Sequence, residues 1–267
     1  MEAQTALNVM TFNIRYNNTA DGINAWPNRK DKVISQILFH HPHTLGLQEA
    51  LHDQVEDLVK ALPGYKYTGV GRIDGKMKGE YSAIFYDASR LQLLQSETFW
   101  LAEKTDLPFV KGWDAALERI VTWALFRDKK TKKNFYHFNT HFDHRGKVAR
   151  RESAKLLLEK VNSIAGKTPV IITGDFNAIP DDEPIKILTD KNDPKYLTDA
   201  KSVSVMPHYG PDGTFNAFTS KETSNNPIDY IFIKKGFSVL QHATLSQTWQ
   251  GLFSSDHFPV MASLVFK

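Results

Sequence analysis

The sequence of 267 residues contains no cysteine. This excludes disulfide bonds and cysteine-based zinc sites, so a bound metal would need oxygen or imidazole ligands. There is also no apolar run of about 18 residues, the length that a membrane-spanning helix needs. No signal peptide or other targeting segment is recognised. Because strand-like residues begin at Leu7, the compartment stays open: cytoplasmic, or exported after loss of a leader.

The sequence also lacks a strong excess of positive or negative charge. The chain has 33 basic and 30 acidic residues, a net charge of +3. This mild bias neither indicates nor excludes a nucleic-acid partner. With 41% hydrophobic and 12% aromatic residues, the chain has enough apolar surface for a sizeable core. Nothing in the sequence points to a protein partner, and a monomer is expected.

The hydrophobic pattern predicts many strands with helices between some of them. Strands are expected over residues 7–14, 44–50, 65–71, 81–87, 91–101, 119–128, 134–144, 169–177, 227–234, 237–246 and 257–266. Helices are expected around 33–38, 51–62, 147–164 and 185–188. No repeat, low-complexity tract or linker interrupts the chain, so residues 1–267 are expected to form a single domain. The pattern predicts the α/β class, with two stacked sheets flanked by helices.

Polar side chains recur where these predicted strands end. The stretch "VIITGDFNAI" shows the feature most clearly, because a buried strand runs into Asp175 and Asn177. A buried carboxylate is costly unless it is paired or binds a metal. The same kind of position holds Asn13, Glu49, His141, Asp143, Asp229, Asp256 and His257. In "THFDH" and "GDFN" the i, i+2 spacing places both side chains on one face of the extended chain.

These residue types suit one chemistry. Carboxylates and amides without thiolates favour a hard cation such as Mg²⁺ or Mn²⁺, which neutralises charge on phosphate oxygens. A carboxylate can orient and deprotonate water, and an imidazolium can stabilise the transition state. Each position also has a structural explanation, such as a turn, a helix cap or a satisfied buried histidine. The recurrence at six strand ends favours a shared site over these separate explanations.

At this level of detail the sequence resembles the endonuclease/exonuclease/phosphatase superfamily. The resemblance rests on "TFNIR", "LQE", "NTHFDH", "GDFN", "IDYIF" and "SDHFP", which occur in the expected order along almost the whole chain. It implies a four-layer α/β/β/α sandwich of two mostly antiparallel mixed sheets, with the site at one edge of the sheets. It also implies in-line hydrolysis of a P–O bond by water.

The resemblance implies roles for the strand-end residues. Glu49 would be the principal metal ligand, with Asn13 and Asp256 as further ligands or orienters. Asp175 would position and deprotonate the attacking water, and Asn177 would hold that water or a phosphate oxygen. His257 would contact the scissile phosphate, and Asp229 would fix its tautomer and charge. His141 would bind another phosphate oxygen.

Four further residues are candidates for substrate binding. Arg119 opens a predicted strand and can reach phosphate, or it forms a surface ion pair with Glu118 or Glu103. Tyr81 stands near where some family members carry a phosphate-contacting aromatic, or it is a packed strand residue. Trp113 belongs to a long loop that can line the mouth of the site. Asp143 shares the "THFDH" motif with His141.

The branch of the family is less well defined by sequence. After "GDFN" the chain has Ala178-Ile179, and Tyr230 follows Asp229. Both differ from the inositol polyphosphate phosphatases. The expected activity is therefore that of a phosphodiesterase or nuclease, with nucleic acid or a nucleotide preferred as substrate. A phosphatase or phospholipase acting on a small phosphorylated or lipid substrate is the alternative, and a non-catalytic binding module is another.

Overall fold

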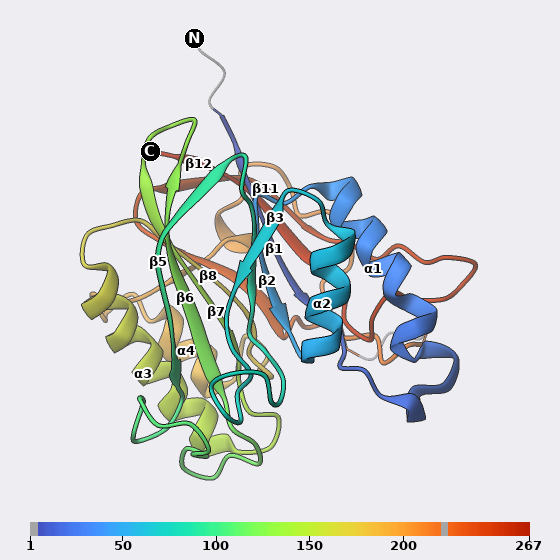
Figure 1. Cartoon of the computed structure of the whole chain (residues 1–267). Coiled ribbons are helices and arrows are strands. Elements are labelled where there is room, and N and C mark those ends of the chain that lie inside the picture. The colour runs from blue at the N-terminus through green and yellow to red at the C-terminus, as the bar shows by residue number, and fades with distance from the viewer. Residues whose placement is uncertain (1–4, 220–223) are drawn as a thin grey trace.

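The computed structural model describes residues 5–219 and 224–267. Two six-stranded sheets pack face to face, and helices cover both outer faces (Figure 1). This arrangement confirms the predicted α/β/β/α sandwich of two mixed, mostly antiparallel sheets. Within each sheet one pair of neighbouring strands is parallel, and the other neighbours run antiparallel.

The first sheet contains both ends of the described chain. Its strand order is β11-β12-β1-β2-β4-β3. The bounds are β1 Leu7–Asn13, β2 Thr44–Gln48, β3 Tyr65–Thr68, β4 Ile84–Asp87, β11 Phe237–Thr244 and β12 Val260–Phe266. The central strands β1 and β2 are the parallel pair. They are almost completely buried, as expected for strands covered on both faces.

The second sheet is formed by the middle of the chain. Its strand order is β5-β6-β7-β8-β10-β9. The bounds are β5 Leu91–Trp100, β6 Ile120–Asp128, β7 Asn134–His141, β8 Val170–Asp175, β9 Thr198–Asp199 and β10 Asp229–Lys234. Strands β7 and β8 are the parallel pair, and α3 forms the crossover between them. The two-residue strand β9 was not predicted, because so short an edge strand carries no periodic signal.

Helices α1 (Trp26–His40) and α2 (His52–Ala61) cover the first sheet, and α3 (Lys147–Ala165) and α4 (Glu183–Thr189) cover the second (Figure 1). Each pair shares a buried apolar cluster with the outer face of its sheet. Two short 3₁₀ helices, η1 (Thr19–Asn24) and η2 (Lys201–Val203), were not predicted. No helix within residues 5–219 and 224–267 combines the length and apolar character that crossing a membrane requires.

Several strand predictions ran one to three residues beyond the observed bounds; for example, the strand expected over 134–144 ends at His141, and the one over 257–266 begins at Val260. Two of these predictions flank one loop. The strands expected over 65–71 and 81–87 end at Thr68 and begin at Ile84. Gly69 and Gly71 interrupt the ladder: Gly69 has φ +132°, and a Cβ on Gly71 would lie 2.4 Å from the carbonyl oxygen of Lys78. The intervening residues instead fold into a loop, which carries Arg72 and Glu80 to the cavity described below.

The interface between the sheets is apolar over much of its area but contains a polar network centred on Asn139 of β7. The Asn139 amide nitrogen donates to the carbonyl oxygens of Leu47 (2.8 Å) and Ala83 (2.9 Å) in the facing sheet. Its oxygen accepts hydrogen bonds from Gln48 (2.7 Å) and Thr173 (2.9 Å). All of these groups are buried. The Ala83 carbonyl, Gln48 and Thr173 also have further partners, so the network connects the two sheets through several shared hydrogen bonds.

Glycine is required opposite this network. A Cβ on Gly46 of β2 would lie 2.1 Å from Thr173 Oγ1 and 2.4 Å from Asn139 Oδ1. The absent side chain is therefore what lets the two sheets approach closely enough for the hydrogen bonds to form.

We expect Asn139→Leu to lower the free energy of unfolding by about 3 kcal/mol, since the Leu47 and Ala83 carbonyls and the Gln48 amide each lose one buried hydrogen bond, at about 1 kcal/mol per bond. Urea denaturation measures the change. Asn134→Leu, an exposed position on the same strand, is the control and should cost much less. Equal losses in the two variants would contradict a special role for Asn139.

A second prediction concerns His137, which lies between Thr44 (2.7 Å) and Thr173 (2.8 Å) in the same interface. Burial lowers its pKa to about 3. As pH falls below the unfolded-state pKa of about 6.5, the unfolded chain binds a proton that the folded chain does not, so stability falls by up to about 1.4 kcal/mol per pH unit.

We therefore expect His137→Gln to flatten the decrease in stability between pH 6.5 and pH 4. Urea midpoints measured across this range test the expectation. The control is His41→Asn, at an exposed position whose φ of 45° suits asparagine. An unchanged pH slope in His137→Gln would show that other groups control acid stability.

Candidate active site

A cavity of about 580 Å³ opens where several strands of both sheets end. Its volume is within the usual range for small-molecule sites, about 300–1,000 Å³. Within the described part of the chain its lining residues are Arg15, Tyr16, Glu49, Arg72, Glu80, Leu117, Arg119, His141, His144, Asp175, Asn177, Phe215, Asp256 and His257.

Strand register explains why distant residues meet here. In the second sheet His141 at the end of β7 pairs with Asp175 at the end of β8, and Asp175 pairs with Asp229 at the start of the antiparallel strand β10. In the first sheet Asn13 ends β1 beside Gln48, so Glu49 follows at the same edge. The polar residues thus converge because parallel strands end, and antiparallel strands begin, at this edge.

Three residues next to the strand ends have left-handed backbone conformations. They are Arg15 (φ 54°), Glu49 (φ 64°) and Asn177 (φ 47°). Such values are uncommon for residues other than glycine and concentrate at functional sites. The backbone hydrogen bonds here are specific: Arg15 N donates to Asn13 Oδ1 (3.0 Å), and Tyr16 N donates to Glu49 Oε2 (3.1 Å).

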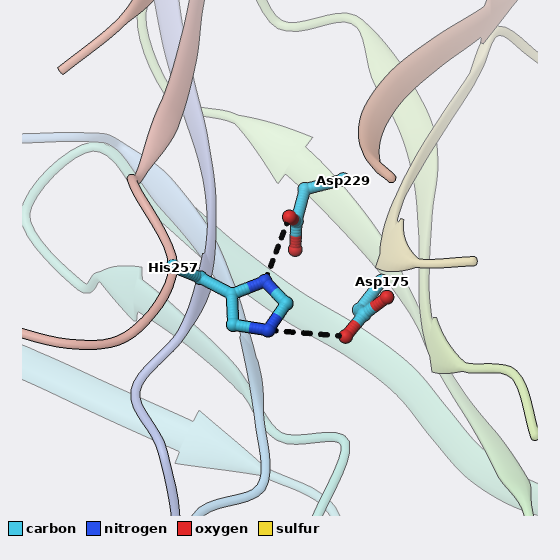
Figure 2. Close-up of side chains that lie close together, drawn as sticks. All are labelled: Asp175, Asp229 and His257. Carbon is cyan, nitrogen blue, oxygen red and sulfur yellow. Dashed lines mark hydrogen bonds and ion pairs between the residues drawn. The ribbon is translucent and has the colours of Figure 1, made fainter. Parts of the chain in front are cut away.

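His257 lies between two aspartates, as Figure 2 shows. Its Nδ1 is 2.9 Å from Asp229 Oδ2, and its Nε2 is 3.8 Å from Asp175 Oδ2. Thr214 Oγ1 donates to the same Asp229 oxygen at 2.6 Å. Burial opposes protonation of His257, but Asp229 and Asp175 outweigh it and raise the pKa of His257 well above its ordinary value. A protonated ring carries a hydrogen on both nitrogens: Nδ1 donates to Asp229, whereas Nε2 is directed at Asp175 without a hydrogen bond to it.

The Asp175 carboxylate is 1% exposed. Oδ1 accepts from Asn177 N (2.9 Å), and Oδ2 accepts from Asn13 Nδ2 (3.0 Å). Burial, followed by repulsion from Asp229, raises the pKa of Asp175 to about 7, although His257 and the hydrogen bonds oppose this shift. A carboxylate that titrates near neutral pH can accept a proton from water.

A second group of oxygen donors lies at Glu49 and Asp256. Asn13 Nδ2 contacts Glu49 Oε1 at 3.0 Å. Arg15 lies 4.0 Å from Glu49 and 3.8 Å from Asp256, and its guanidinium forms two hydrogen bonds with Asp21. Burial raises the pKa of Asp256, and repulsion from Glu49 adds to the increase. A divalent cation would relieve this repulsion, and an all-oxygen set matches Mg²⁺ or Mn²⁺.

Asp175, Asp229 and His257 also lie close enough for one ion, with ligand atoms within 4.8 Å of one another. We favour the Glu49 and Asp256 side because His257 Nδ1 is already engaged in a 2.9 Å hydrogen bond with Asp229 Oδ2. The short contact between His257 and Asp229 is that of an oriented donor rather than a metal ligand.

The loops that carry these residues are joined through Arg29 of α1, which is 1% exposed. Its guanidinium donates to the carbonyl oxygens of Ile14, Arg15 (2.6 Å) and Ser254 (3.1 Å). It thereby connects the segment after β1 with the segment before Asp256. Burial lowers the pKa of Arg29 to about 10, so it still carries its charge at neutral pH.

The structure brings most of the predicted site residues together at the cavity and leaves the others outside its lining. Asn13, Glu49, His141, Asp175, Asn177, Asp229, Asp256 and His257 come together at the cavity or directly beneath it. Tyr81 is buried with its hydroxyl 3.0 Å from the Lys76 carbonyl oxygen, and Trp113 is half-buried in its loop. Neither is among the lining residues given above.

Arg119 and Asp143 form a pair at the cavity wall. Arg119 lines the cavity, and its Nε lies 3.3 Å from Asp143 Oδ2. Asp143 stands behind it and accepts hydrogen bonds from the backbone of Gly146 (2.7 Å) and Arg145 (2.9 Å). Asp143 is therefore a positioning residue for Arg119, not a lining residue.

Sequence reasoning missed five charged or titratable lining residues, one of which, Tyr16, follows Arg15. Arg15 belongs to the quoted "TFNIR" motif, so its position two residues after Asn13 was an available signal. Arg72 and Glu80 lie on the loop between β3 and β4 and have no strand-end signal. His144 follows Asp143 in "THFDH" and was not singled out.

Two stacked sheets with carboxylates, amides and histidines at a shared edge define the fold and site of a phosphate-ester hydrolase. The sequence matches the model of the Endonuclease/Exonuclease/phosphatase family over residues 10–257. The chain therefore belongs to this family.

Three similar proteins show how far the likeness extends along the chain. A family member from Bacteroides vulgatus is 40% identical, with a TM-score of 0.94 over 99% of this chain and 100% of that one. A mannosyl-6-phosphatase from Bacteroides thetaiotaomicron is 37% identical, with a TM-score of 0.92 over 97% and 100%. Protein angel of Drosophila melanogaster is 30% identical over 178 residues, which are 63% of this chain and 48% of that protein. The chain thus spans about half the length of Protein angel.

We expect Mg²⁺ or Mn²⁺ to raise the midpoint of thermal unfolding, since an ion that binds the folded state adds about 2.7 kcal/mol at 100 times its Kd. Glu49→Gln should abolish this increase, whereas His257→Gln should retain it. Calorimetric scans with the ion and with a chelator make the measurement. The reverse pattern would place the cation at Asp175, Asp229 and His257.

Proposed function

We propose that the protein is a divalent-metal-dependent phosphatase that hydrolyses the phosphate monoester of a small polar alcohol, with Mg²⁺ or Mn²⁺ as the metal. The main support for this proposal is that His257 lies between Asp229 and Asp175, at a cavity that Glu49 and Asp256 also line. One part of the site can accept a proton from water, and another can donate to a phosphate oxygen.

The residues have distinct tasks in this proposal. Asp175, with its pKa of about 7, orients the attacking water and accepts its proton. His257, held as an imidazolium by Asp229, donates from Nε2 to a phosphate oxygen as negative charge develops there. Asn177 and Asn13 hold Asp175 by hydrogen bonds. Glu49, Asp256 and Asn13 would hold the cation, which when bound polarises the phosphoryl group.

The substrate class is supported by a relative. The mannosyl-6-phosphatase matches nearly the full length of both chains at 37% identity, which favours a phosphorylated sugar. The cavity volume of about 580 Å³ suits a ligand of that size. The sequence alone favoured nucleic acid or a nucleotide, and we now prefer the smaller substrate. A binding-only role is disfavoured because both the proton-accepting and the cationic groups are present.

We expect Asp175→Asn and His257→Gln each to reduce kcat for mannose 6-phosphate hydrolysis by about 10²–10⁴-fold, the usual contribution of one general acid or base. Release of inorganic phosphate measures the rate. Asp181→Asn and His52→Gln, outside the cavity, are the matched controls. Activity at the wild-type level in either site variant would refute the role assigned to it.

The same assay, run on a panel, tests the substrate class. Sugar phosphates, nucleotides, DNA, RNA, inositol phosphates and phospholipids are compared in Mg²⁺. We expect the highest kcat/KM for a sugar phosphate. A preference for DNA or RNA would instead support the nuclease assignment that the sequence favoured.

A further inference from the structure

Three buried nitrogen atoms without hydrogen-bond partners lie together at one wall of the cavity. They are Arg72 Nε, Arg119 Nη1 and His141 Nδ1. None has a hydrogen-bond partner among the residues that the structure describes, and the Glu80 carboxylate lies 3.9 Å from His141 Nδ1. The parent residues are 7%, 4% and 7% exposed, so solvent does not readily satisfy them. They share the wall with a small recess that Glu80, Tyr81 and Ser82 also line. Buried donors normally have hydrogen-bond partners, so three unpaired donors at one wall favour the binding of a ligand with acceptor oxygens there.

Arg119 is fixed so that one nitrogen remains available. Its Nε donates to Asp143 (3.3 Å), and its Nη2 lies 3.0 Å from His144 Nδ1. Asp143 is itself held by backbone N–H groups at 2.7 Å and 2.9 Å. Arg119 therefore has a defined orientation and an unused N–H at Nη1.

Arg72 is fixed in a similar way. Its two terminal nitrogens bind both oxygens of Glu80 at 2.6 Å and 2.7 Å. Its backbone carbonyl accepts a hydrogen bond from Trp100 Nε1 at 2.8 Å. The Glu80 pair balances the charge of Arg72 but leaves the Nε hydrogen unused. Since a guanidinium only donates, that position can be satisfied only by an acceptor.

His141 contributes the third donor because of its tautomer. Asn177 Nδ2 is 3.0 Å from both the Phe142 carbonyl oxygen and His141 Nε2. The carbonyl can only accept, so the amide nitrogen is correctly placed and donates to Nε2 as well. The proton of the neutral ring is then on Nδ1, which is the atom without a partner.

We propose that Arg72, Arg119 and His141 bind the terminal oxygens of a phosphate monoester and make the protein select monoesters over diesters. This proposal rests on the proposed phosphatase function and names the residues that determine its specificity. A monoester presents three non-bridging oxygens and up to two negative charges, whereas in a diester one of these oxygens carries a second organic group. That group would occupy the space beside the three donors, and one charge would be lost.

The position of this wall fits the proposed reaction. His141 Nε2 lies 3.4 Å from Asp175 Oδ2, so the donor wall adjoins the residue that would orient water. Glu49 and Asp256 gather instead around Arg15. A phosphate between the two groups would have a cation site on one side and N–H donors on the other.

The test compares two substrates with the same leaving group, p-nitrophenyl phosphate and methyl p-nitrophenyl phosphate. We expect Arg119→Met to lower kcat/KM for the monoester by about 10- to 100-fold more than for the diester, which is the range for one hydrogen bond to a charged group. Arg119→Lys should recover part of the loss, since lysine restores the positive charge but not the planar set of N–H donors of a guanidinium. Arg127→Met, an exposed position on β6, is the control and should leave the ratio unchanged.

Arg72 needs a paired variant, because removing it alone leaves the Glu80 carboxylate buried without its partner. Arg72→Met combined with Glu80→Gln removes both charges and should lower the monoester-to-diester ratio in the same direction. Thermal unfolding of each variant verifies that it is folded. A proportional loss of both substrates in the Arg119 and Arg72 variants would overturn the proposal while leaving phosphoesterase activity intact.

Binding of inorganic phosphate provides a readout without turnover. Calorimetry in the presence of Mg²⁺ should show a Kd raised by about 10- to 100-fold in Arg119→Met and in the paired variant. If wild-type protein hydrolyses neither the aryl phosphates nor a sugar phosphate but binds phosphate through Arg119, the proposed function fails and the anion site stands. Unchanged phosphate affinity in both variants would overturn the site itself.

Discussion

The buried side-chain amide of Asn139 holds the two sheets in one alignment, and the active site depends on that alignment. It donates to Leu47 and Ala83 of the facing sheet and accepts from Gln48. Hydrophobic contact is not directional and would tolerate sliding of one sheet over the other. Hydrogen bonds between buried groups are directional and costly to break. Because Gln48 directly precedes Glu49, the alignment that satisfies Asn139 also decides where that carboxylate lies.

The same alignment brings together charges that repel one another. Asp175 and Asp229 are neighbours in the sheet, and both are buried. His257 between them compensates part of the repulsion, and Thr214 and Asn13 supply hydrogen bonds. Burial and the remaining repulsion from Asp229 raise the pKa of Asp175. Rigid strands can hold such a cluster in place, and active sites commonly sacrifice stability in this way.

The sequence predicted the layers of the fold and the residues at the strand ends, because both follow from local patterns. A strand that ends on Asp175 or Glu49 is visible in a run of a few letters. The loop that carries Arg72 and Glu80 shows no such pattern, since its shape depends on glycine contacts with other segments. The Asn139 network was missed for the same reason: its partners lie on separate strands, and their meeting is a property of the packed sheets.

The two sides of the cavity offer different groups to a phosphate dianion: carboxylates on one side and N–H donors on the other. Glu49 and Asp256 would repel it, and in the proposed function Arg15 and the bound cation would offset this repulsion. On the opposite wall Arg119 and Arg72 are held in place by Asp143 and Glu80, which also balance their charges, so this wall offers oriented N–H donors. Fixed donors of this kind need little rearrangement when charge shifts onto the phosphate oxygens. The arginine wall and the acidic side are therefore complementary, and each supplies what the other lacks.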